Sequence, residues 1–217
     1  MVTHLLFDLD GTLTDSQEGI TRSVDYALRT VCGIETADLN TLTPYIGPPL
    51  VDGFMENHGL DRATAARCRD AYRERYADIG LFENAVYPGI PEALTALRDA
   101  GCQLAVATSK PEVFAKKILA HFDLDRPFAV ISGASMGGQI STKADVVAQT
   151  LARLGNPPVS DVLMIGDRRH DVLGAAACGV RTVGVLYGFG SREELTQAGA
   201  AALCETPGDL PRVICAL

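Results

Sequence analysis

The order of hydrophobic and polar residues predicts a chain in which strands and helices alternate. Five short apolar runs are each too short for a helix, and each ends in polar or glycine-containing residues. Runs that are apolar throughout are typical of strands buried on both faces of a parallel sheet. We therefore predict strands at residues 4–7, 104–107, 128–131, 162–165 and 182–186.

Helical spacing fills the segments between these runs. Apolar residues recur with the helical period over residues 91–100, 111–121 and 144–154, and each segment begins at or near a proline, serine or threonine. Because parallel strands need crossover connections, the alternation after residue 100 predicts an α/β fold, a doubly wound parallel sheet with helices on both faces.

Residues 16–84 break this rhythm. Ile20, Val24, Ala27 and Val31 have helical spacing, as do positions between residues 61 and 78, and no convincing strand lies between them. A proline-rich loop that contains Gly47 separates the two segments. At 217 residues the chain is too short for two full-sized domains. We expect a core formed by residues 1–15 and 85–217, interrupted by a small helical insertion at residues 16–84.

The charge balance excludes some partners. The chain has 19 basic and 27 acidic residues, and its net charge of -8 has the wrong sign for holding nucleic acid or anionic lipid. No run approaches the roughly 18 apolar residues of a membrane span. Six cysteines form no C-x-x-C pair, and an aspartate at position 8 argues against a signal peptide. We expect a cytoplasmic protein with no nucleic-acid polymer and no membrane as partner.

The first predicted strand runs into the motif D-x-D-G-T, which contains Asp8, Asp10 and Gly11. Ligands of open parallel sheets bind beyond the carboxyl ends of the strands. Carboxylates two residues apart on an extended chain project to the same side, which is unfavourable unless a cation lies between them. A solvated acidic turn is the alternative, and it is less consistent with a position directly after a buried strand.

A second acidic motif, G-D-x-x-x-D, follows the strand predicted at residues 162–165. Asp167 ends that strand, and Asp171 falls where the next helix begins. A carboxylate there is also an ordinary helix cap, so the motif alone leaves both interpretations open. Together the two motifs supply the oxygen ligands that Mg²⁺ prefers.

Two further segments favour anion binding. Thr108 and Ser109 offer hydroxyls and turn amides ahead of a helix that begins near Pro111. Lys143 lies at the start of a predicted helix, where the helix dipole disfavours a cation unless that cation faces an anion. A solvated surface lysine is the alternative interpretation of Lys143 taken alone.

These motifs, in this order, resemble the haloacid dehalogenase-like (HAD) superfamily of phosphatases over nearly the whole chain. The resemblance implies a Rossmann-like catalytic core, with the insertion as an all-α four-helix cap. Within the superfamily the chain is most similar to the phosphoglycolate phosphatase-like group. Residues 143–145, 166–171 and 185–195 resemble a branch that is labelled 5'-nucleotidase-like.

The resemblance also implies roles for the motif residues. Asp8 would be the nucleophile, and Asp10 would be the general acid and base. Lys143 would neutralise charge at the nucleophile and the phosphate. The other implied assignments are a Mg²⁺ site formed by Asp8, Asp10, Asp167 and Asp171, and phosphate or substrate contacts from Gly11, Thr108, Ser109, Lys143 and Gly47.

These roles predict a Mg²⁺-dependent phosphomonoesterase that hydrolyses small phosphorylated metabolites through an aspartyl-phosphate. Asp10 argues against a dehalogenase, because the departure of halide needs no proton. A phosphomutase of the same superfamily stays open, as does, from a different class, a phospho-receiver or non-enzymatic binding domain. We expect a monomer or weak homodimer whose leaving group is recognised by the cap near Gly47.

Overall fold

The computed structural model describes residues 2–217 and divides the chain into two compact units. One unit comprises the residues up to Asp15 together with Val86–Leu217, and the other comprises Ser16–Ala85. The chain therefore leaves the first unit once and returns to it once.

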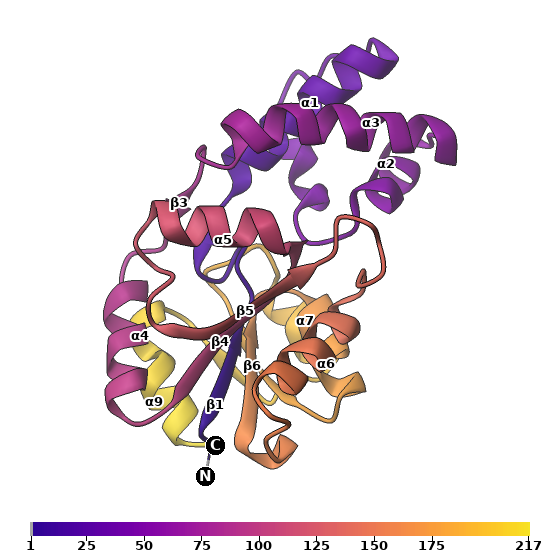
Figure 1. Cartoon of the computed structure of the whole chain (residues 1–217). Helices are drawn as coiled ribbons and strands as arrows, with labels where there is room; N and C mark the ends of the chain where they lie inside the picture. Colours follow the sequence, from indigo (N-terminus) through magenta and orange to yellow (C-terminus); the bar gives the residue numbers. More distant parts are fainter. Residues whose placement is uncertain (1) are drawn as a thin grey trace. The chain divides into compact units, whose positions relative to one another are not determined.

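A parallel sheet forms the centre of the first unit (Figure 1). Within residues 2–217 this sheet has six strands in the order β5-β4-β1-β6-β7-β8. The strands are β1 (His4–Phe7), β4 (Gln103–Pro111), β5 (Phe128–Ala134), β6 (Val162–Gly166), β7 (Arg181–Val185) and β8 (Ala202–Cys204). The five predicted strands are confirmed, and β4 and β5 extend beyond their predicted ends. The sequence analysis missed β8, because three residues are too few to show a pattern.

The strand order reverses at β1. This strand pairs with β4 on one side and β6 on the other, so that Phe7 is in register with both Val106 and Ile165. In such sheets the ligand crevice lies beyond the carboxyl ends of the strands at the reversal point. The residues that follow β1, β4 and β6 therefore meet at one edge of the sheet.

Helices cover both faces of this sheet. In Figure 1, α4 (Ile90–Asp99) and α9 (Leu210–Cys215) lie on one side, and α6 (Lys143–Arg153) and α7 (Arg169–Ala177) lie on the other. The unit also contains α5 (Glu112–His121), α8 (Arg192–Ala198) and the 3₁₀ turns Val159–Asp161 and Pro207–Asp209. The predicted doubly wound α/β fold is thus confirmed.

Burial on both faces fixes the position of β1. Leu5, Leu6 and Phe7 are fully buried, and Leu6 packs in a cluster with apolar residues of β4, α6, β6 and α7. Truncating a buried leucine to alanine typically costs about 2–5 kcal/mol. A slip of one residue would turn these side chains to the opposite faces, so the residue that follows the strand, Asp8, has a defined place.

The second unit is helical. It contains α1 (Gln17–Cys32), the 3₁₀ helix Leu39–Tyr45, α2 (Leu50–His58), α3 (Arg62–Arg75) and a π-helical turn, Tyr76–Gly80, that extends α3. Residues 16–85, all of which the structure describes, thus form three α-helices and one 3₁₀ helix in addition to the π-helical turn. The short strands β2 (Thr14–Asp15) and β3 (Ala85–Val86) form a separate two-stranded sheet.

Within this unit, α1 packs closely against the π-helical turn at Gly19. A Cβ atom at Gly19 would overlap the carbonyl oxygen of Gly80. One helical turn further on, the Ser23 hydroxyl donates to the Gly19 carbonyl at 2.7 Å and accepts from Arg75 at 3.1 Å. Arg75 also forms an ion pair with Glu83 at 2.7 Å. These contacts tie α1 to the end of α3.

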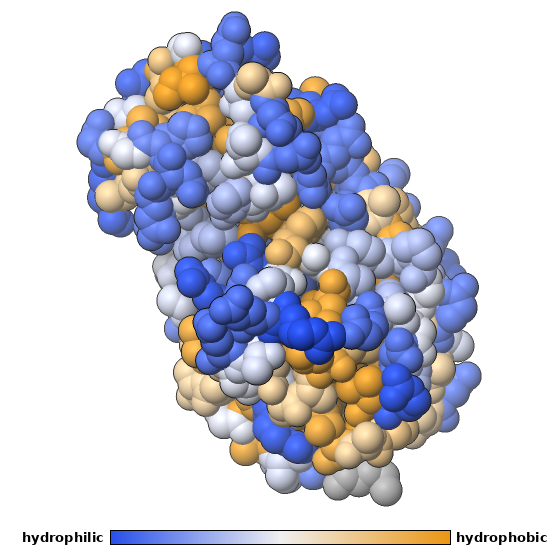
Figure 2. Space-filling model, turned by 180° about the vertical axis from the view of Figure 1, so that it is seen from behind, coloured by the Kyte–Doolittle hydropathy of each residue, from blue (hydrophilic) through white to orange (hydrophobic). Residues whose placement is uncertain are grey.

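Hydrophilic residues cover much of the face shown in Figure 2, and hydrophobic residues gather in groups between them. Large apolar side chains that are partly exposed include Ile79, Phe82 and Val113. In the part of the chain that the structure describes, no helix has the length and apolar character needed to cross a membrane.

We expect Gly19→Ala to lower the free energy of unfolding by about 1–3 kcal/mol, because the added methyl group must displace the Gly80 carbonyl. Urea denaturation followed by circular dichroism measures the change. Gly53→Ala in α2 is the comparison within the same unit. Its Cβ would lie 3.1 Å from the Tyr45 ring, a tight contact but one with a side chain and not with backbone, and alanine is the better helix former, so we expect a smaller loss there. An equal loss from both substitutions would contradict the tight packing at Gly19.

Candidate active site

Asp8 follows β1 directly, and its carboxylate contacts the backbone of the next residue and the side chain of Lys143. Its backbone N–H donates to the Ile165 carbonyl at 2.9 Å, which continues the ladder between β1 and β6. Its Oδ1 accepts from the Leu9 N–H at 2.8 Å and lies 3.0 Å from Lys143 Nζ. Asp8 is only 7% exposed, so water screens its charge weakly.

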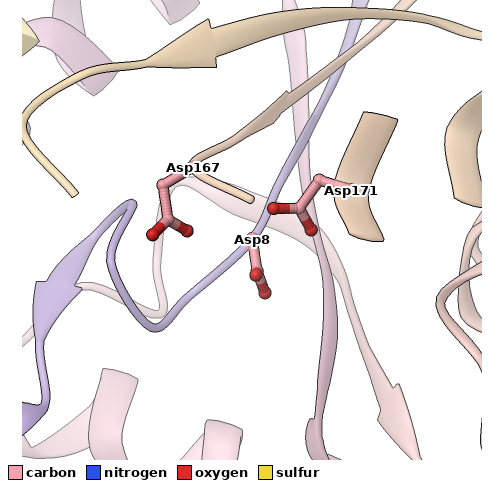
Figure 3. Close-up of side chains that lie close together, drawn as sticks. All are labelled: Asp8, Asp167 and Asp171. Atoms are coloured by element: carbon pink, nitrogen blue, oxygen red, sulfur yellow. The ribbon is translucent and has the colours of Figure 1, made fainter. Parts of the chain in front are cut away.

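Asp167 and Asp171 bring two further carboxylates to Asp8 (Figure 3). One oxygen of each residue lies within 4.8 Å of the other two, and all three residues are buried. Asp167 follows β6, and Asp171 lies in the first turn of α7. The sheet edge therefore assembles the two sequence motifs into one group, which we call the acidic cluster (Asp8, Asp167 and Asp171).

Hydrogen bonds fix the orientation of the Asp167 and Asp171 carboxylates. Asp167 Oδ2 accepts from the Phe189 backbone N–H at 2.8 Å, and its Oδ1 accepts from the Thr12 hydroxyl at 3.4 Å. Asp171 Oδ2 accepts from the Arg168 N–H at 3.0 Å. Asp171 thus caps α7, as one interpretation of its motif predicts, and it also joins the acidic cluster, where its role as a metal ligand stays a prediction.

Lys143 is buried among these carboxylates. Its Nζ lies 2.7 Å from Asp171 Oδ1 and donates to the Ala107 carbonyl at 3.1 Å, in addition to its contact with Asp8. Gly174 of α7 permits this path, because a Cβ there would lie 2.6 Å from Lys143 Cγ. The alternative of a solvated surface lysine is therefore wrong, and the unfavourable place at a helix start is explained by the anions that the ammonium faces.

Burial and mutual repulsion change the proton affinities in this group. Burial, followed by the charges of Asp171 and Asp8, raises the pKa of Asp167 well above its usual value. Burial raises the pKa of Asp171 to about 6, although Lys143 acts in the opposite direction. Burial would lower the pKa of Lys143, but Asp171 and Asp8 more than offset this and raise it. Lys143 therefore stays charged, and its ammonium pairs with two of the three carboxylates, Asp8 and Asp171.

The acidic cluster fits a divalent cation. When all three carboxylates are ionised, Lys143 offsets only one of their charges, and buried charge without compensation is strongly unfavourable. Carboxylate oxygens are the hard ligands that Mg²⁺ takes. Asp8, Asp167 and Asp171 are the residues that would hold the ion.

The Asp10 side chain has a different partner. Lys110 Nζ lies 2.7 Å from Asp10 Oδ2, and both side chains are largely buried. Lys110 thus supplies a cation beside Asp10, whereas a metal role for Asp10 stays a prediction. Sequence analysis missed Lys110, although its place directly after Thr108 and Ser109 was a usable signal.

The residues predicted to bind phosphate or substrate belong to both units. Thr108 is buried in β4, and its hydroxyl accepts from the Lys110 N–H at 3.2 Å; Ser109 beside it is half-buried. Gly11 has a φ of +80°, and a Cβ there would overlap a carboxylate of the acidic cluster, so the position requires glycine. Gly47 has a φ of +105° and lies in the second unit. Their contacts with substrate stay predictions.

A loop after β7 supports Asp167 from a second side, and sequence analysis assigned it no site role. Besides the N–H of Phe189, the loop contributes two glycines at which a Cβ would overlap Asp167, namely Gly188 and Gly190. Two glycines around one aromatic residue were the available signal, since glycine marks places where backbones approach closely.

One edge of the doubly wound sheet carries two acidic motifs, a buried lysine and a buried threonine. This is the arrangement expected from the resemblance of the sequence to HAD-like hydrolases. The chain belongs to the haloacid dehalogenase-like hydrolase family, whose model matches residues 5–185. The predicted superfamily and the prediction of a hydrolase are thereby confirmed.

Known proteins similar to this chain carry several names. It is 47% identical over 211 residues to the 5'-nucleotidase of Pseudomonas aeruginosa, covering 97% of this chain and 95% of that protein. It is 44% identical over 186 residues to the tyrosine-protein kinase PtkA of Mycobacterium tuberculosis, covering 86% of this chain and 62% of the kinase. It is 34% identical over 218 residues to the phosphoglycolate phosphatase of Pseudomonas syringae pv. tomato, covering 97% of this chain and 78% of that protein.

A solved structure described as "a predicted phosphatase from Clostridium acetobutylicum" has the same fold. It superposes with a TM-score of 0.96 at 46% identity and covers 100% of both chains. The match confirms the HAD-type core together with its inserted helical segment.

We expect Mg²⁺ to raise the melting temperature, and to raise it more at about pH 7.5 than at about pH 5. The pKa of Asp167 and of Asp171 is raised in the folded protein, so the folded state holds these protons more tightly than the unfolded chain. Without the ion, the free energy of unfolding therefore falls as the pH rises from the pKa of these carboxyl groups in the unfolded chain through the pKa of about 6 that Asp171 has in the folded protein. Differential scanning fluorimetry with and without Mg²⁺ measures both trends.

Two variants sharpen this measurement. Asp167→Asn should lose most of the Mg²⁺ response, whereas Asp99→Asn, on the exposed end of α4, should keep it. A wild-type response in Asp167→Asn would contradict a cation site at the acidic cluster.

Proposed function

We propose that the protein is a Mg²⁺-dependent phosphomonoesterase that hydrolyses small phosphorylated metabolites through an aspartyl-phosphate on Asp8. The observation that carries this proposal is the position of Asp8, whose buried carboxylate lies against Lys143 and beside Asp167 and Asp171. Phosphoryl transfer depends mainly on positioning and on the stabilisation of negative charge. A carboxylate, an ammonium and a cation site around one point meet that requirement.

In the first step, Asp8 attacks phosphorus. The contacts of Asp8 with the Leu9 N–H and with Lys143 both use Oδ1, which leaves Oδ2 to form the new bond. The bond between phosphorus and the ester oxygen breaks, and Asp10 gives its proton to that oxygen. Mg²⁺, when bound, supplies positive charge that reduces repulsion between the carboxylate and the phosphate dianion. Lys143, whose Nζ lies 3.0 Å from Asp8 Oδ1, adds to this effect.

In the second step, water releases the phosphate. Asp10 has become a carboxylate and takes a proton from the water that attacks phosphorus; the bond between phosphorus and Asp8 Oδ2 breaks, which releases inorganic phosphate and restores the Asp8 carboxylate. Thr108, with Ser109 and Gly11, binds the phosphoryl oxygens while this occurs. Transfer to a second substrate hydroxyl instead of water would make the protein a phosphomutase, which is the alternative within the same family.

A nucleoside 5'-monophosphate is the first substrate class to test. The support is the 47% identity to the Pseudomonas aeruginosa 5'-nucleotidase over nearly the full length of both proteins. Phosphoglycolate is the second candidate, supported by 34% identity to a phosphoglycolate phosphatase. The chain covers only 62% of the tyrosine kinase, so that activity is not carried over. The family match disfavours a phospho-receiver.

The remaining parts of the proposal concern location and partners. A cytoplasmic protein is supported by six cysteines that are all free thiols, as is usual in reducing compartments. A net charge of -8 supports a small phosphorylated metabolite as partner and disfavours a nucleic-acid polymer or an anionic membrane. We propose a monomer or weak homodimer.

Asp8→Asn should abolish hydrolysis of p-nitrophenyl phosphate, lowering kcat/KM by about 10³-fold or more. The amide has nearly the size of the carboxylate but is not a nucleophile. Circular dichroism should show an unchanged fold, and Asp99→Asn serves as the matched control. Sustained phosphate release by Asp8→Asn would overturn the assignment of the nucleophile.

Asp10→Asn should slow the hydrolysis of alkyl phosphates by about 10²–10⁴-fold, the usual contribution of a general acid. Its effect on p-nitrophenyl phosphate should be at least about tenfold smaller, because a good leaving group needs little protonation. Steady-state kinetics on both esters give the comparison. Equal losses would argue against Asp10 as the general acid.

A further inference from the structure

Lys110 is a buried lysine to which none of the motif assignments gives a role. Its side chain is 5% exposed and that of Asp10 is 13% exposed, with 2.7 Å between Nζ and Oδ2. A surface ion pair contributes little because water and mobility weaken it, but this pair is largely withdrawn from water. Removing one partner would leave the other as a poorly compensated charge.

The backbone of Lys110 is held in place on two sides. Its N–H donates to the Thr108 hydroxyl at 3.2 Å. On the neighbouring strand, a Cβ at Gly133 would lie 2.5 Å from the Lys110 carbonyl oxygen, so the two backbones are in close contact. Because β1 and β4 are adjacent and parallel, with Phe7 in register with Val106, their carboxyl ends lie side by side. Lys110 therefore reaches Asp10 from a fixed base.

The two oxygens of Asp10 are in different surroundings. Oδ2 lies against Lys110, whereas Oδ1 is buried and has no hydrogen-bond partner among residues 2–217. The Asp10 backbone is also fixed, since the next residue donates its N–H to the Thr14 carbonyl at 2.8 Å. With the backbone and one oxygen held, rotation of the carboxylate is restricted, and the other oxygen is left for a ligand that the protein does not supply.

We propose that Lys110 is a positioning residue for the general acid and base. It holds Oδ2 of Asp10, so that Oδ1 is presented to the ester oxygen in the first step and to water in the second. This inference rests on the proposed function, because it assigns Lys110 a part in that reaction. Lys110 acts through Asp10 and not through the phosphoryl group, and this distinguishes it from Lys143, which lies against the nucleophile.

The test is kinetic and uses the full-length protein with Mg²⁺. Lys110→Met keeps the length of the side chain and removes its charge. We expect kcat on alkyl phosphates to fall by about 10²-fold, the scale of a misplaced catalytic group, with KM changed by less than about twofold. The loss on p-nitrophenyl phosphate should be at least about tenfold smaller. Lys117→Met, on the exposed face of α5, is the matched control and should behave as wild type.

A double variant shows whether Lys110 works through Asp10. In an Asp10→Asn background, Lys110→Met should cause little further loss, since residues that act as one unit are not additive. Lys110→Arg should recover part of the alkyl-phosphate activity, because it restores a cation at this place. Should Lys110→Met fail to fold, the arginine variant alone still tests the proposal through its intermediate, leaving-group-dependent loss.

Three results would overturn the inference. A raised KM with equal losses on alkyl and aryl esters would place Lys110 on the phosphoryl group. Additive losses in the double variant would show that Lys110 does not act through Asp10, and wild-type kinetics in both Lys110 variants would show that it has no part in the reaction. A wild-type protein that hydrolyses no phosphate ester would instead overturn the proposed function itself. The two failures are therefore distinguishable.

Discussion

The candidate active site depends on one electrostatic constraint: three buried carboxylates lie close together, and one buried ammonium pairs with two of them. Asp8 follows β1, Asp167 follows β6 and Asp171 lies in α7, whereas Lys143 lies at the start of α6. Like charges held this close in a place with little water repel one another strongly. The surrounding structure must hold these carboxylates together. The buried strands β1 and β6, which are hydrogen-bonded to each other and lead into Asp8 and Asp167, do so. The same repulsion makes the site receptive to a cation.

The two aspartates of the D-x-D motif are only two positions apart, yet each has its own lysine. Asp8 lies against Lys143, which belongs to α6, and Asp10 lies against Lys110, at the end of β4. Asp8 also shares its surroundings with two other carboxylates, whereas Asp10 has no place in the acidic cluster. One short motif thus presents two carboxyl groups in different electrostatic surroundings, and the proposed division between a nucleophile and a proton donor rests on this difference.

Much of this arrangement is predictable from apolar runs and the residues that follow them. A buried strand is visible in sequence because both of its faces are apolar, and the carboxyl ends of adjacent parallel strands must meet. Hence the meeting of Asp8 with Asp167 and Asp171 follows from the pattern. The pairing of Lys110 with Asp10 does not, because the apolar run ends at Ala107 while β4 continues to Pro111. Polar residues that extend a strand leave no hydrophobic signal, and short elements such as β8 leave too few residues to show one.

The support of Asp167 by the loop after β7 has a consequence for how such a protein changes over evolutionary time. Phe189 donates its N–H to Asp167, and its flanking glycines approach Asp167 closely. Glu194 accepts hydrogen bonds from the Arg168 side chain at 2.9 Å and from the Arg169 N–H at 2.8 Å, at the start of α7. These residues lie beyond position 185, where the match to the family model ends. Neighbours of this kind alter metal affinity while the ligands stay the same. Substitutions in this loop are therefore a route by which related sequences change the surroundings of Asp167 while all three carboxylates of the acidic cluster are retained.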